Sequence, residues 1–95
     1  MRNTLGMTYL YVGEPAAAVA QLERAWELRR AGLGAVHADT LASMHDLGVA
    51  CEFAGELERA RSLLEQVWHE RGVRLGADHP ETLRTLQELA SAHLA

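Results

Sequence analysis

The sequence predicts an all-α protein built as a short α-solenoid, in which antiparallel helix pairs stack side by side. The first observation is a string that occurs twice, since LGAVHADTL at 33–41 returns 42 residues later as LGADHPETL at 75–83. At the same offset about one position in three is identical, and self-similarity at a period of tens of residues is typical of stacked repeats. The second observation is the spacing of apolar residues by three and four positions, as in amphipathic helices. Together they predict about two and a half repeats.

Five helices are expected, and their approximate ranges are 3–12, 15–31, 39–54, 56–74 and 80 to the C-terminus. Glycines that suit a left-handed cap follow the periodic segments, namely Gly13, Gly32, Gly34, Gly55 and Gly76. Pro15 and Pro80 suit the first turn of a helix. Gly72 is expected to loosen the last turn of the fourth helix by up to about 1 kcal/mol relative to alanine.

The repeats divide the single domain, 1–95, into three parts: a first, N-terminally clipped repeat at 1–34, a second repeat at 35–76 and a lone first helix at 77–95. We expect the lone helix to cap the array, because one of its faces is polar. That face carries Arg84, Thr85, Gln87, Glu88 and Ser91. Since roughly three repeats are usually needed for stable stacking, we expect either a fragment of a longer array or pairing through the open ends.

Composition and charge exclude several classes of function. The net charge of −4 comes without any basic run that could neutralise a row of phosphates, so nucleic acid is not an expected partner. Neither a membrane-spanning apolar run nor a secretory signal is visible, so we expect a cytoplasmic protein without membrane contact. All nine basic residues are arginine and isoleucine is absent, which favours a GC-rich, bacterial gene.

Candidate catalytic and metal-binding residues have a structural explanation in each case. His37 and His79 lie at equivalent points of the linkers, where a ring can hydrogen-bond the start of a helix; they lack the neighbouring ligands of a zinc site. Cys51 and His93 fall on apolar faces, where a cysteine is inert. The glutamates of the second helices suit solvated faces. We therefore expect no catalytic residue, no metal and no cofactor, and hence no enzyme.

Two tryptophans, Trp26 and Trp68, occupy identical points in successive second helices. Tryptophan is enriched at binding hot spots. Both residues fall on apolar stripes, however, so packing against the following helix is the favoured interpretation.

Each repeat contains a leucine–glycine pair, a residue three positions after the glycine, a further glycine, and a small and a bulky residue in the second helix. These residues are Leu5, Gly6, Tyr9, Gly13, Ala18 and Leu22 in the first repeat, and Leu47, Gly48, Cys51, Gly55, Ala60 and Leu64 in the second. In this pattern the sequence resembles the tetratricopeptide repeat family. The 42-residue period is similar to that of the kinesin-light-chain-like subtype. Cys51 in place of the aromatic, Ala38 in place of a proline and Leu89-Ala90 in place of leucine–glycine depart from the pattern.

The resemblance implies a right-handed solenoid whose first helices line a concave groove that binds a peptide. Carried over by alignment, the groove residues are Asn3, Met7, Leu10, Tyr11, Ala42, His45, Asp46, Val49, Glu52, Arg84, Gln87, Glu88 and Ser91. The mixture of apolar and charged side chains suits a peptide-binding wall. Asp46 and Glu88 would repel a carboxylate, so the clamp with which some relatives hold acidic C-termini of chaperones is not expected here.

The leading hypothesis is a protein-interaction scaffold that binds a peptide segment or a partner domain in this groove. One alternative is a fragment or sensor arm of a larger bacterial signalling protein, a Ser/Thr kinase or transcriptional regulator, whose catalytic part lies elsewhere. A third hypothesis is a self-assembly element that forms a homo-oligomer through its open repeat ends.

Overall fold

A computed structural model describes residues 15–94, and the side chains of residues 15–91. These residues form four α-helices and no strand: α2 (Pro15–Leu33), α3 (Ala38–Phe53), α4 (Leu57–Leu75) and α5 (Pro80–Leu94). The four expected helices in this part of the chain are confirmed to within about two residues at most ends, as is usual for helix boundaries. The fifth expected helix, over about 3–12, lies outside the described residues.

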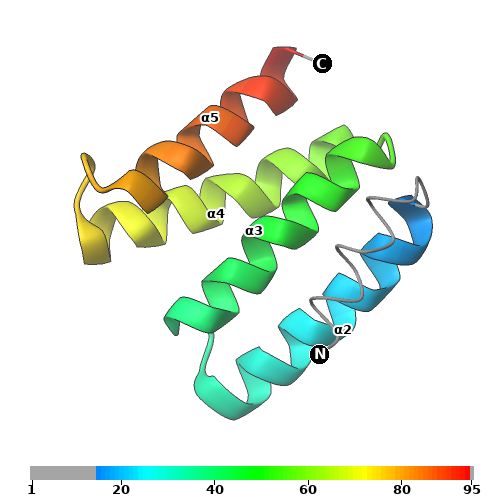
Figure 1. Ribbon diagram of the computed structural model, residues 1–95, viewed down its shortest axis with the longest axis horizontal. Coiled ribbons are helices and arrows are strands. Elements are labelled where there is room, and N and C mark those ends of the chain that lie inside the picture. Colours follow the sequence, from blue (N-terminus) through cyan, green and yellow to red (C-terminus); the bar gives the residue numbers. More distant parts are fainter. Residues whose placement is uncertain (1–14, 95) are drawn as a thin grey trace.

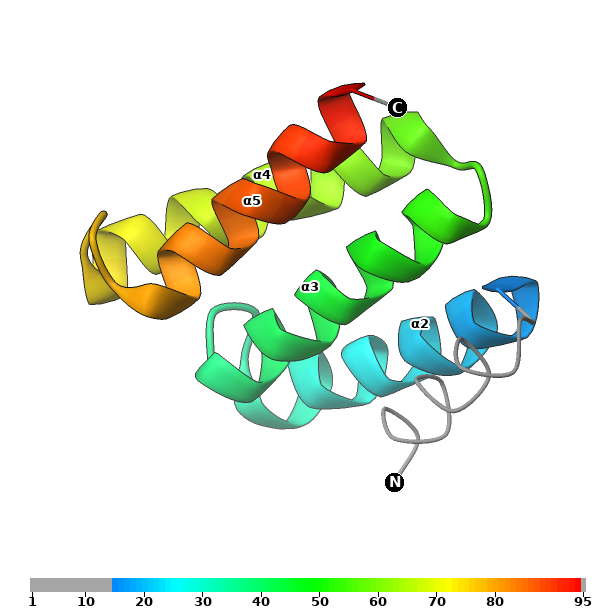
Figure 2. The same cartoon turned by 45° about the horizontal axis from the view of Figure 1, so that its top comes forward.

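Successive helices run antiparallel and side by side (Figures 1 and 2). Each of the four packs against its neighbours in the sequence, and α3 also approaches α5, the corresponding helix of the next repeat. The result is a slab with extents of 34 × 33 × 19 Å. Within the described residues, no helix is long and apolar enough to cross a membrane.

The helices end at glycines with positive φ, at Gly34 (98°), Gly55 (84°) and Gly76 (98°). At Gly55 the backbone forms a Schellman cap. The N–H of Gly55 donates to the carbonyl of Glu52 (3.1 Å), and the N–H of Glu56 donates to that of Cys51 (2.8 Å). Three of the predicted stops are thereby confirmed; Gly32 instead lies inside α2, whose last residue is Leu33.

The starts of α3 and α5 are capped by the paired histidines of the linkers. Nδ1 of His37 accepts a hydrogen bond from the N–H of Asp39, and Nδ1 of His79 accepts one from the N–H of Glu81, both at 3.1 Å. Each ring thus satisfies one of the backbone donors that a helix start leaves without an intrahelical partner. The structural role predicted for these histidines is confirmed.

The main core lies between α2, α3 and α4. Leu22 on α2, Leu47 and Cys51 on α3, and Ala60 and Val67 on α4 are fully buried in it. Leu64 is also fully buried and packs with Leu89 of α5, which continues the core toward the C-terminal end. On α3 and α4 the core is therefore formed by apolar residues spaced three and four positions apart, as expected for amphipathic helices.

The repeats are joined by two equivalent arginines. Arg29 of α2 donates to the carbonyl of Asp39 (3.1 Å) and to Oγ of Ser43 (2.8 Å) on α3. Arg71 of α4 donates to the carbonyl of Glu81 (3.3 Å) and to Oγ1 of Thr85 (2.7 Å) on α5. Each arginine therefore ties a second helix to the first helix of the following repeat. Thr85, expected on the polar outer face of α5, is fully buried because it completes this contact.

Two glycines inside helices predict opposite effects of the same substitution. A Cβ at Gly48 would lie 2.9 Å from Cγ of the fully buried Leu64, whereas a Cβ at Gly72 would meet nothing within 4 Å. We expect Gly72→Ala to raise the free energy of unfolding by about 0.5–1 kcal/mol, since alanine is the better helix former. Gly48→Ala is expected to lower it, because overpacking costs about 1–3 kcal/mol and outweighs that gain.

Urea unfolding of the two variants, followed by circular dichroism, measures both values. Gly76→Ala serves as a control, because its positive φ of 98° strains any side chain and predicts a loss without a packing clash. Equal stabilisation by Gly48→Ala and Gly72→Ala would show that α3 and α4 are not in close contact at Gly48.

Candidate binding surface

The candidate surface is the face shared by α3 and α5, the first helices of two successive repeats. At the C-terminal ends of these helices Oγ of Ser91 donates to Oε1 of Glu52, with 3.0 Å between the two oxygens. Two residues predicted for one groove from different helices thus touch. Asn3, Met7, Leu10 and Tyr11, the groove residues expected from the first helix, lie outside the described residues.

Most of the remaining predicted groove residues reach the surface. On α3, Ala42, Asp46, Val49 and Glu52 are half-buried; on α5, Glu88 is half-buried and Arg84, Gln87 and Ser91 are exposed. His45 is the exception, because it is only 4% exposed and so has almost no surface to offer a ligand. Its Nδ1 lies 3.7 Å from Oδ1 of Asp46. The face therefore presents short apolar side chains between carboxylates and an arginine.

Charges of both signs meet at the middle of this face. Arg71 is 6% exposed, and its guanidinium lies 3.4 Å from Oε2 of Glu81. Burial, more than any other cause, lowers the pKa of Arg71; the charge of Arg84 also lowers it, while Glu81 and Asp46 raise it. Arg84 and Asp46, which the sequence placed in the groove, thus lie close enough to Arg71 to act on its charge. A ligand on this face therefore meets charges of both signs, from the half-buried Asp46 and from the exposed Arg84.

A cleft of about 380 Å³ adjoins one end of this face. Its apolar walls come from the second repeat and include Val36, Leu41 and Leu75, and Arg74 and Glu81 also line it; Ala42, one of the predicted groove residues, is part of the lining as well. The sequence did not reveal this cleft, because it forms where the first linker meets the end of α4. The size suits one apolar side chain or more of a bound partner.

Cys51 is fully buried, and burial, as the largest effect, raises the pKa of its thiol, against the charge of Arg59, which lowers it. A thiol with a raised pKa stays protonated at neutral pH and is a poor nucleophile. Among the described residues, no group of three or more histidine, cysteine, aspartate or glutamate side chains is placed to hold a metal ion.

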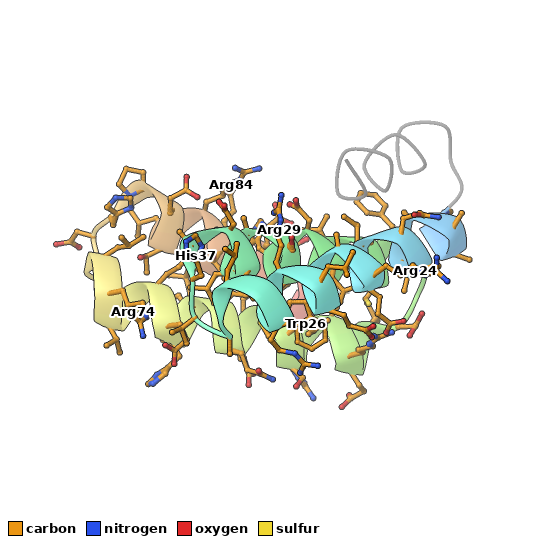
Figure 3. All side chains as sticks on the ribbon, turned by 90° about the horizontal axis from the view of Figure 1, so that it is seen from below. Arg24, Trp26, Arg29, His37, Arg74 and Arg84 are labelled. Carbon is orange, nitrogen blue, oxygen red and sulfur yellow. The ribbon has the colours of Figure 1, made fainter. Side chains whose placement is uncertain are left out.

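The tryptophans differ, although the sequence predicts one role for both. Trp26 packs against the main core, with the guanidinium of Arg30 4.7 Å above the centre of its ring. Figure 3 shows Trp26 on the side of the slab away from His37 and Arg84. Trp68 is 41% exposed, so the prediction that it faces inward is wrong. Trp26 lies beside α4, since residues of α4 line the same cleft. Among the described helices none follows α5, so none covers Trp68 as α4 covers Trp26.

Antiparallel helix pairs with a 42-residue period, tied in series by equivalent arginines, define a helical-repeat protein of the α-solenoid class. The family can also be stated. The chain belongs to the tetratricopeptide repeat family, whose model matches residues 1–67.

Two solved structures confirm the subtype. One is a protein of Podospora anserina described as a "putative kinesin light chain" with nearly identical TPR-like repeats, and the other is a point variant of it. Both are 32% identical to this chain, with TM-scores of 0.91 and 0.90 for the protein and the variant. The match covers 98% of this chain and 44% of each solved chain, so this chain spans less than half of their length. No curated protein matches the chain. Tetratricopeptide repeats are typically non-catalytic scaffolds for protein–protein interaction.

Proposed function

We propose that the chain is a protein-interaction module that binds a peptide segment, or an exposed segment of a partner domain, along the face of α3 and α5. The observation that carries this proposal is the common face itself. On α3, Ala42 and Val49 leave apolar surface one helical turn from Asp46; α5 contributes Arg84 and Glu88, and the hydrogen bond between Glu52 and Ser91 joins the two helices. Such a mixture of apolar contact and fixed charge is what recognition of a peptide requires.

The arrangement of charge describes the ligand. Asp46 and Glu88 attract a basic side chain, and Arg84 attracts an acidic one, so the favoured ligand carries both signs. An apolar side chain of the ligand fits the cleft between Val36, Leu41 and Leu75. A ligand whose only charged group is a terminal carboxylate is disfavoured by the two acids.

Charge reversal on this face tests the proposal. The double variant Asp46→Arg, Glu88→Arg is expected to weaken binding of a basic–apolar peptide by about tenfold to a hundredfold, and to strengthen binding of an acidic–apolar peptide, because each close charge pair changes sign. Fluorescence anisotropy with a panel of labelled peptides measures both affinities. Circular dichroism checks that the helical content is unchanged.

The matched control is Glu58→Arg, the same change on α4 at a side chain that is 90% exposed. It alters the net charge without altering the face of α3 and α5, so the order of peptide affinities should stay the same. If the control shifts the affinities as much as the double variant does, net charge and not this face selects the ligand. The proposal would then be wrong.

The same binding role is compatible with a place in a larger signalling protein, the alternative raised by the sequence. The solved relatives contain more than twice the length matched here, which supports a longer protein and leaves the signalling role a proposal. In that arrangement the repeats bind the partner and a separate domain acts on it. We propose no catalytic role for this chain, and its cytoplasmic location and bacterial origin stay predictions.

A further inference from the structure

Phe53, the last residue of α3, carries an aromatic ring that is 70% exposed. A single exposed apolar side chain is common on protein surfaces and does not by itself mark a site. The place of Phe53 on its helix and the charges around it distinguish this ring. Its equivalent 42 residues earlier, Tyr11, is aromatic as well and is one of the predicted groove residues.

Phe53 lies in the row of α3 residues that reach the surface. Positions 42, 46, 49 and 53 are spaced by four, three and four residues, which places them on one side of an α-helix. Ala42, Asp46 and Val49 are half-buried there. Cys51, on the opposite side of the helix, is fully buried. Phe53 therefore extends the face of α3 and α5 that we propose for peptide binding to the C-terminal end of α3.

The C-terminal end of α3 is electrostatically negative. A helix carries about half a negative charge at this end, and α3, which the structure describes over its whole length, has no basic residue in its last turn to offset it. The residue before Phe53, Glu52, adds a carboxylate that Ser91 holds in place, with 3.0 Å between Oγ and Oε1. Among the described residues nothing hydrogen-bonds the buried Oε2 of Glu52, so the charge of this carboxylate is compensated on one side only.

A nearby cation of α4 does not neutralise this end. The pKa of Cys51, two positions before Phe53, is raised chiefly by burial and lowered by the charge of Arg59, so Arg59 acts at this end of α3. Arg59 is paired with two carboxylates, however, since it hydrogen-bonds Glu23 of α2 and lies 3.6 Å from Oε1 of Glu56. The ring of Phe53 thus lies in surroundings with an excess of negative charge.

We propose that Phe53 binds a cationic side chain of the ligand, an arginine or a lysine, at the C-terminal end of the face of α3 and α5. This inference rests on the proposed function and adds the place at which the basic group of the ligand is bound. The face of an aromatic ring attracts a cation, and both Glu52 and the helix end favour the same sign of charge. An apolar side chain could contact the ring but would gain nothing from this field, and an acidic one would be repelled.

Two matched peptides test this role of Phe53. One alternates leucine and arginine, and the other has citrulline at each arginine, which keeps the shape of the side chain but removes its charge. Phe53 is the only phenylalanine of the chain, so incorporation of labelled phenylalanine gives NMR signals of this ring alone. We expect the arginine peptide to shift these signals at saturation and to bind more tightly than the citrulline peptide in fluorescence anisotropy.

Variants of Phe53 separate the effect of charge from that of apolar contact. Phe53→Leu is expected to weaken binding of the arginine peptide by about two- to fivefold, as for an exposed cation–π contact, and to change binding of the citrulline peptide by less. Phe53→Trp should strengthen binding of the arginine peptide, because an indole attracts a cation more strongly than a phenyl ring does. The side chain is exposed, so both variants are expected to fold. The matched control is Leu28→Phe, which adds a ring on α2 at a side chain that is 61% exposed, and it should leave both affinities unchanged.

Two results would overturn the role of Phe53. One is that its signals do not move when the arginine peptide is bound; the other is an equal loss for both peptides in Phe53→Leu, which would make the ring a purely apolar contact. The Asp46→Arg, Glu88→Arg variant tests the proposed function separately. If it weakens binding of the arginine peptide while Phe53→Leu weakens both peptides equally, the face binds the peptide and only the role of Phe53 is wrong. If it leaves the affinity unchanged, the proposed face is wrong, and the signals of Phe53 alone decide whether the ring binds the cation.

Discussion

Replacing Leu64 with alanine is expected to lower the free energy of unfolding by about 2–5 kcal/mol. Leu64 is fully buried where three helices meet, since it packs with Leu89 of α5 and lies against Gly48 of α3. Deleting its side chain leaves a cavity between rigid helices in addition to the lost burial of apolar surface. Total stabilities are about 5–15 kcal/mol, so this change removes a large fraction of the stability of so short a chain.

Urea unfolding followed by circular dichroism measures the effect, and Leu28→Ala is the matched control. Leu28 is 61% exposed, so the same substitution should change the stability by about 0.5 kcal/mol or less. Losses of the same size at the two positions would contradict the described core. A double-mutant cycle adds a second check, because Gly48→Ala should cost less once Leu64→Ala has made room for the new methyl group.

The position of Leu64 could be read from the sequence, and the reason is the repeat. Leu22 and Leu64 occur 42 residues apart on the apolar stripes of two second helices, and both are fully buried. Helix ends could also be predicted from local chemistry, since glycine tolerates the positive φ found at Gly55 and Gly76. Helix starts could be predicted because the linker histidines accept hydrogen bonds from backbone N–H groups of the first turn. Local signals of this kind depend on residues a few positions apart, which the sequence displays directly.

The exposure of individual side chains could not be predicted from the sequence, because it depends on residues that approach each other only when the helices stack. Trp26 and Trp68 lie at equivalent points on the apolar stripes of α2 and α4, yet only Trp26 packs against the core, while Trp68 is exposed. His45 aligns with groove positions but is buried. An alignment predicts which face of a helix a residue lies on, but it does not predict how exposed its side chain is. The groove was therefore predicted from the family resemblance, and of its predicted residues those on α3 and α5 lie in the described part of the chain.

The contacts of the two arginines could be predicted only in part from the sequence. Arg29 and Arg71 are identical between repeats, and their partners are similar in kind, with Ser43 matched by Thr85. The same charged residue at the same position of both repeats indicated that Arg29 and Arg71 make equivalent contacts. Its partners became visible only in the structure, since 14 residues separate Arg71 from the hydroxyl it contacts.

Replacing Arg71 with alanine is expected to lower the free energy of unfolding by about 2–3 kcal/mol. Two effects contribute: loss of the charge-assisted hydrogen bonds to the carbonyl of Glu81 and to Oγ1 of Thr85, and loss of packing by the buried stem of the side chain. Arg71 is buried, so its charged form is already destabilised by desolvation, which lowers its pKa and limits the size of the loss. The contacts must outweigh this cost for the substitution to destabilise the chain.

The equivalent substitution Arg29→Ala provides the comparison. Arg29 makes the same pair of contacts, but its side chain is only half-buried and its bond to the carbonyl of Asp39 is exposed to water, so a loss of about 1 kcal/mol is expected. Thermal and urea unfolding of the two variants measure both values. A loss at Arg71 no larger than the loss at Arg29 would show that desolvation cancels the contacts of Arg71. It would also show that apolar packing alone, chiefly of Leu64 on Leu89, holds α5 on the array.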